Sequence, residues 1–137
     1  MPPPQMTILN APIRDACIAR RERTNTPSQA LLLLNESEYV KAARSLAQKV
    51  IARNIKPEQQ IELAYETVTS KLPDKTELAI LSELVEDLQK RYGENPALAE
   101  EICRGITLKN AGEKGRLAAW TMLISAVYNL DITKTRE

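Results

Sequence analysis

The sequence contains no His and no Phe, and only two Cys, one Trp and four Gly among its 137 residues. Without His, the chain has no Ser-His-Asp or Cys-His nucleophile system and no His-ligated zinc or haem site. Cys17 and Cys103 are too few for a thiolate zinc site or a disulfide framework, although one bridge between them stays open. No Cys-x-x-Cys-His motif exists for covalent haem attachment, so we expect no cofactor bound to this chain alone.

Long apolar runs are also missing. No stretch approaches the roughly 18 apolar residues that span a bilayer, and the N-terminus has no charged region followed by an apolar one. We therefore expect no membrane span. The charge is balanced, with 19 Lys and Arg against 18 Asp and Glu and a formal net charge of +1. Because nucleic-acid binding calls for a basic face or aromatic platforms, we expect no nucleic-acid partner.

The apolar residues instead recur at helical spacing through most of the chain, which predicts an all-α fold. We predict a compact bundle of about five or six helices, preceded by an extended Pro-rich N-terminal arm. Residues 1–25 form this arm and contain an Arg cluster, whereas residues 26–137 form one helical domain. The expected helices begin near Thr26, at a cap formed by Asn35 or Ser37, and near 57, 74, 95 and 115.

Two capping boxes are predicted, Thr26 with Gln29 and Asp74 with Glu77, and Gly93 is expected to end the fourth helix. The Leu31–Leu34 run is apolar on every side and is expected to be buried all round. Two further helices are predicted to bury one apolar stripe each. The first stripe is Ile61, Ala64, Tyr65, Val68 and Leu72, and the second is Leu117, Trp120, Thr121, Ile124, Val127 and Tyr128.

The most unusual segment is Arg20-Arg21-Glu22-Arg23-Thr24-Asn25-Thr26. Its guanidiniums could clamp phosphates or carboxylates, because Arg presents a planar fork of donors. Since it precedes an apolar helix, part of it lies near buried surface and needs an acidic or carbonyl partner. That partner is Asp15, Glu22 or Asp131 of this chain, or a neighbouring protein. The candidate docking or anion-binding residues are Arg20, Arg21, Arg23, Asn25 and Asp131.

Adjacent carboxylates are the natural acid–base option without His, but neighbours on a helix point in different directions. We therefore interpret Glu36 with Glu38, Glu86 with Asp87, and Glu100 with Glu101 as surface acids. Cys17 and Cys103 are interpreted as small buried apolar residues, although the Arg cluster could lower the pKa of Cys17. No catalytic constellation is present in this chain on its own.

Several motifs match a known family. These are Ala11-Pro12, Cys17, the run from Arg20 to Leu31, Leu33-Leu34-Asn35, Ala118-Ala119-Trp120-Thr121, Asn129-Leu130-Asp131 and Thr135-Arg136-Glu137. Together they resemble the C-terminal region of a planctomycete family of large exported proteins that carry domains of unknown function, often with a planctomycete-type cytochrome c domain. The sequence departs from the family at Asn10, Ile18-Ala19, Ser28 and Ser70–Pro73.

The resemblance implies a C-terminal module of a larger exported protein, located in the periplasm or cell envelope, with the signal peptide and any haem upstream. It carries no established activity. We expect a structural or domain-docking role, with the upstream domains as partners, and the isolated chain could self-associate near Leu31–Leu34. In one alternative, Arg23, Asn25 or Asp131 contributes to a composite active site of the parent, on an anionic polysaccharide or a redox substrate. A weaker alternative is a free-standing binder of anions or nucleic acid.

Overall fold

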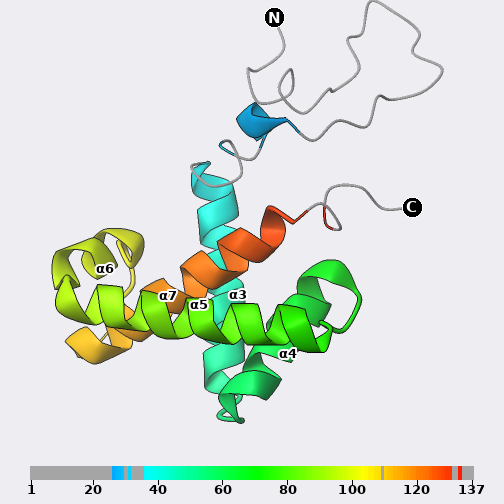
Figure 1. The fold of residues 1–137 in the computed structure, drawn as a ribbon. Coiled ribbons are helices and arrows are strands. Elements are labelled where there is room, and N and C mark those ends of the chain that lie inside the picture. The colour runs from blue at the N-terminus through cyan, green and yellow to red at the C-terminus, as the bar shows by residue number, and fades with distance from the viewer. Residues whose placement is uncertain (1–25, 30, 32–35, 109, 131–132, 134–137) are drawn as a thin grey trace, which may run out of the picture.

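The computed structural model describes residues 26–29, 31, 36–108, 110–130 and 133, and these residues fold into helices without a strand. The all-α prediction is confirmed (Figure 1). The predicted N-terminal arm, residues 1–25, lies outside the described residues. The helices are α3 (Ser37–Ala52), α4 (Pro57–Thr69), α5 (Lys75–Glu94), α6 (Pro96–Ile102) and α7 (Ala111–Tyr128).

Helix α7 forms the centre of the domain. It packs most extensively against α5 on one side and α3 on the other, and α3 and α5 make no contact with each other within the described helices. Figure 1 shows α5 crossing in front, α3 behind and α7 between them. Helix α4 packs at one end of this stack and α6 at the other, so the helices form three layers with α7 in the middle.

The central position of α7 corrects the predicted one-sided stripe. The helix begins at Ala111, four residues before the predicted start at Gly115, and every residue of its second half is buried or half-buried. The reason is that both neighbouring layers cover it, so its small and polar residues are buried together with its aliphatic ones. Its buried residues are Gly115, Leu117, Ala118, Ala119, Trp120, Thr121, Leu123, Ile124, Ser125 and Val127.

Helices α3 and α7, which pack against each other, both bury small side chains. Ala43 and Ala47 of α3 and Ala118 and Ala119 of α7 are all 0% exposed. Alanine lets two helix backbones approach closely, because only a methyl group separates them from the facing helix. Small buried side chains of α3 and α7 are therefore part of a core that contains few aromatic residues.

Both predicted capping boxes are present. The Asp74 carboxylate accepts from the Glu77 backbone N–H at 2.7 Å, and the Glu77 carboxylate accepts from the Asp74 N–H at 2.8 Å. Thr26 and Gln29 exchange the corresponding pair of bonds, at 3.1 and 3.3 Å. Each box satisfies backbone donors that the first helical turn leaves without a partner.

Four local predictions are wrong. The N-cap of α3 is Glu36, not Asn35 or Ser37, and its side chain forms no capping bond. Helix α5 continues through Gly93 to Glu94. Leu72 is 66% exposed, because α4 ends at Thr69 and the chain turns through a left-handed Ser70 (φ 60°) before Leu72 can reach the core.

The fourth correction concerns Leu31, which is 62% exposed rather than buried. The other three leucines of that run lie outside the described residues. As for a membrane span, none of the described helices is both long enough and apolar enough to cross a bilayer.

Candidate functional site

None of the binding residues predicted from the sequence belongs to the described part of the chain. Arg20, Arg21, Arg23, Asn25 and Asp131 all lie outside the described residues. Their proposed roles, in docking or in a composite active site of the parent, therefore stay predictions.

Cys103 is buried beside the start of α7. Its Sγ lies 3.4 Å from the Lys114 carbonyl oxygen, to which the thiol donates, and burial raises the pKa of the thiol despite Arg44 and Lys114 nearby. A raised pKa keeps the group protonated and unreactive at neutral pH. The position agrees with the interpretation of Cys103 as a small buried apolar residue, whereas Cys17 lies outside the described residues.

The adjacent acids lie on the surface as interpreted. Glu38 pairs with Lys41 at 2.7 Å, and Glu100 pairs with Lys114 at 2.9 Å. The hydrogen bond from Lys114 lowers the pKa of Glu100. Exposed ion pairs of this kind contribute little to stability, and across the described part of the chain no three His, Cys, Asp or Glu side chains gather as a metal site would require.

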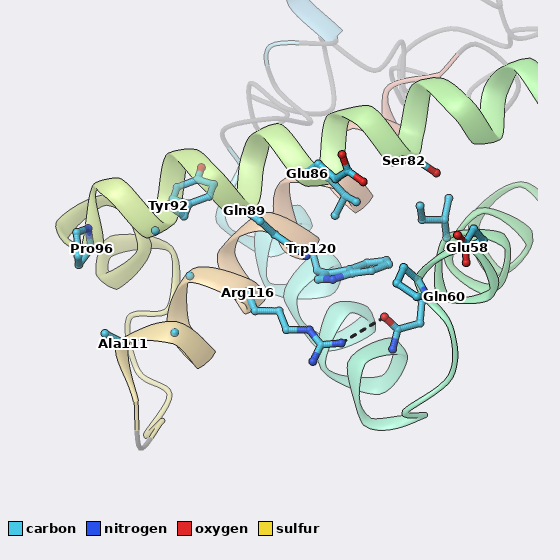
Figure 2. A pocket seen from close by; sticks show the side chains of 16 residues that line it. Glu58, Gln60, Ser82, Glu86, Gln89, Tyr92, Pro96, Ala111, Arg116 and Trp120 are labelled. Carbon is cyan, nitrogen blue, oxygen red and sulfur yellow. Dashed lines mark hydrogen bonds between the residues drawn. The ribbon is translucent and has the colours of Figure 1, made fainter.

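A groove of about 690 Å³ lies between α4, α5 and the first half of α7, and we name it the Trp120 groove (Figure 2). Its volume falls within the range typical of ligand sites, roughly 300–1,000 Å³. Its lining residues are Pro57, Glu58, Gln60, Ile61, Ser82, Val85, Glu86, Gln89, Tyr92, Gly93, Pro96, Ala111, Gly112, Gly115, Arg116 and Trp120.

Trp120 lines this groove from the centre of α7. The side chain is 1% exposed, and its indole Nε1 has no hydrogen-bond partner in the described part of the structure. A buried N–H without an acceptor costs free energy, so buried Trp side chains usually have a partner. The prediction that Trp120 belongs to the core is confirmed, and its unpaired N–H marks the groove as the place where an acceptor is missing.

Gln60 and Arg116 connect two walls of the groove. Gln60 is 1% exposed; its Nε2 donates to the Val50 carbonyl oxygen at 3.3 Å. Its Oε1 accepts from Nη2 of the exposed Arg116 at 3.4 Å, the contact drawn in Figure 2. Because this contact is long and the guanidinium has five donors, Arg116 keeps most of its hydrogen-bonding capacity for another group.

Two carboxylates face the groove from the opposite walls. Glu58 comes from the first turn of α4 and Glu86 from the middle of α5, and both are exposed. Neither forms a salt bridge with Arg116, since the ion pairs found among the described residues are those of Lys41 and Lys114. The groove therefore presents one cation and two anions to whatever enters it.

The sequence analysis missed Gln60 and Arg116, although helical spacing could have found them. Gln60 lies one turn before Ala64, which was placed on the inner face of its helix, and Arg116 lies one turn before Trp120. Neither was included among the predicted core or site residues, because polar residues are mostly exposed. A polar residue at an apolar position of a helical stripe is the signal that would have marked them.

Comparison with known proteins places the chain in a family without giving it an activity. No curated protein and no solved structure matches it. A family model described as a protein of unknown function, DUF1553, matches residues 1–85. The match includes the Arg cluster, α3, α4 and the first half of α5, and the groove residues of α7 lie beyond it. A planctomycete origin and a cytochrome c neighbour stay predictions, but a match over more than half of its length shows that the chain belongs to the DUF1553 family of proteins of unknown function.

Proposed function

We propose that this chain is a docking module, a helical domain that forms the C-terminal part of a larger exported protein and binds its upstream domains. Its place of action is then the periplasm or cell envelope, and it needs no cofactor of its own. The proposal assigns the chain to protein–protein contact and leaves any chemistry to the parent protein.

The Trp120 groove is the observation that carries this proposal. It is open, it is built from three helices, and it has a buried aromatic side chain at its floor and charged groups at its edges. Protein–protein contact sites commonly combine a buried aromatic anchor with a polar rim. The unpaired indole N–H of Trp120 supports a contact that is completed by another chain.

The Arg cluster supports docking from the sequence. It lies within the segment that the family model matches. Arg residues are favoured at interfaces because the planar guanidinium forms bidentate bonds with carboxylates. We assign Arg21 and Arg23 to contacts with acidic groups of the upstream domains.

Co-purification with the upstream part of the parent protein tests this function. Tagged residues 1–137 are co-expressed with that part, as wild type and as Arg21→Glu with Arg23→Glu. The double variant is expected to retain less than about a tenth of the bound partner, because charge reversal turns attraction into repulsion.

The matched control is Lys49→Glu with Arg53→Glu, which reverses two exposed charges at the end of α3. It is expected to bind as the wild type does. Equal recovery of the partner by all three proteins would show that the Arg cluster has no docking role, and absence of any complex with the wild type would refute the docking function itself.

A further inference from the structure

We propose that the Trp120 groove binds an extended, basic polypeptide segment of a partner protein. This inference rests on the proposed docking function and adds the chemistry of the segment that is bound. The length of the groove, the charge of two of its walls and the hydrogen-bond donors of its third wall support it.

The groove is long enough for an extended peptide. Its lining on α5 runs from Ser82 to Gly93, and at 1.5 Å of rise per residue this is about 16 Å. An extended chain advances about 3.3 Å per residue, so about five residues occupy that length. A segment of this kind reaches from Glu58 and Ser82 at one end of Figure 2 to Pro96 and Ala111 at the other.

Two walls of the groove belong to an acidic helical hairpin. Helix α4 carries three acidic residues and no basic one, and α5 carries five acidic and three basic residues, so together they have a net charge of −5. The whole chain has a net charge of +1, so negative charge is concentrated on these two helices. Glu58 and Glu86 bring that charge to the groove without a salt-bridge partner in the described structure, and a Lys or Arg of the bound segment supplies one.

The third wall offers donors that suit a peptide backbone. Within the described part of the chain, Arg116 makes one long contact and the Trp120 N–H has no acceptor. An extended segment presents a carbonyl oxygen at every residue, and each of these needs a donor when it leaves water. Nε1 of Trp120 is fully buried, so a carbonyl reaches it only when a lining side chain moves.

The floor of the groove is apolar, with Ile61, Val85 and Tyr92 buried beneath it. Successive side chains of an extended chain point in opposite directions. A sequence that alternates small and basic residues can therefore place its small side chains on the floor and its basic ones toward Glu58 and Glu86. This pattern defines the probe for the experiment.

The full 137-residue chain is titrated with two acetylated and amidated peptides of eight residues, one alternating Lys with Ala and one alternating Glu with Ala. Trp120 is the single Trp of the chain, so its fluorescence reports the groove directly, and calorimetry gives the dissociation constant. We expect saturable binding of the Lys peptide that weakens as salt is added. The Glu peptide is expected not to bind.

Two double variants separate the groove from the general charge of the hairpin. Glu58→Gln with Glu86→Gln removes the two lining carboxylates and is expected to weaken binding about five- to tenfold. Glu66→Gln with Asp87→Asn removes two exposed acids of the same helices that do not line the groove, and it is expected to bind as the wild type does.

Equal losses in both double variants, or binding of the Glu peptide, would overturn the proposal. Sedimentation of the chain alone adds a further check, because a dimer that the Lys peptide dissociates would show that a second copy occupies the groove and would overturn the assignment to a partner protein.

Failure of peptide binding while the upstream domains still co-purify refutes this inference alone. Loss of co-purification with peptide binding intact refutes the proposed docking instead.

Discussion

Tyr65 links α4 to the start of α5 through a single carboxylate. Its side chain is 2% exposed, and its hydroxyl donates to Glu77 Oε1 at 2.9 Å, while Oε2 of the same residue accepts from the Asp74 backbone. Burial, together with the hydrogen bond and negative charge of Glu77, raises the pKa of Tyr65 to about 12. The pKa values of Tyr92 and Tyr128 are also raised, mainly by burial.

A raised pKa in the folded state makes stability depend on pH in the alkaline range. Below about pH 10 Tyr65 is neutral in both the folded and the unfolded state, and its contribution to the free energy of unfolding is fully present. As the pH rises from 10 to about 12, the unfolded chain releases the proton first, so the free energy of unfolding falls. Tyr65→Phe is expected to make this fall shallower but not to abolish it, since Tyr92 and Tyr128 shift in the same direction.

Urea unfolding at intervals between pH 8 and pH 12 measures this slope. At pH 8 the Phe variant is expected to lose about 1 kcal/mol, the typical net value of one hydrogen bond. Tyr39→Phe, on the half-buried Tyr39 of α3, is the matched control. A Tyr65→Phe slope equal to that of the wild type would show that the Tyr65 proton is not held more tightly in the folded state.

Among the helices, the start of α5 depends on its capping box. Asp74→Ala removes the acceptor for the Glu77 N–H and is expected to lower the free energy of unfolding by about 1 kcal/mol. Asp87→Ala, an exposed site within the same helix, is the matched control and is expected to change it by less than about 0.5 kcal/mol. Denaturant midpoints measure both, and equal effects would mean that the cap contributes nothing specific.

The capping boxes were predictable because they depend on residues three positions apart. The starts of α4 and α6 were predictable because proline suits the first position of a helix. The exposure of Leu72 was not, since it follows from the left-handed Ser70 that ends α4 early. Nor was the burial of α7 beyond its predicted stripe, because it follows from two other helices packing against it. Sequence periodicity reports which residues share a face but not how many faces are covered.

In the candidate site, too, some features were predictable from local sequence and others depend on how the helices pack. Trp120 was correctly predicted to be in the core, because its apolar stripe is local. The Trp120 groove joins Glu58 and Gln60 to Arg116, which lie more than fifty residues apart in sequence, so its existence depends on how the helices are placed. No pattern within one helix contains that information.

The domain as a unit depends on the crossing of α3 and α7. Arg44 of α3 secures the end of α6 beside this crossing, since its Nη1 donates to the carbonyl oxygens of Ile102 and Arg104 at 2.9 Å each. Ile102 is the last residue of α6 and Arg104 lies two residues beyond it, where backbone acceptors otherwise lack intrahelical partners. Arg44 therefore joins α3 to the end of α6, and both of these helices also pack against α7, so damage at the crossing is expected to affect the whole domain.

Ala47→Leu tests this dependence. Ala47 is 0% exposed at the crossing, and a larger side chain there forces the two helices apart, so the free energy of unfolding is expected to fall by about 1–3 kcal/mol. Ala42→Leu adds the same atoms to an exposed site of α3 and is expected to change it by less than about 0.5 kcal/mol. Circular dichroism and Trp120 fluorescence should give one shared transition in the variant, because the crossing supports every layer. If instead the fluorescence of Trp120 changes at lower urea than the helical signal, the helices unfold separately and α7 is not the common core that its position indicates.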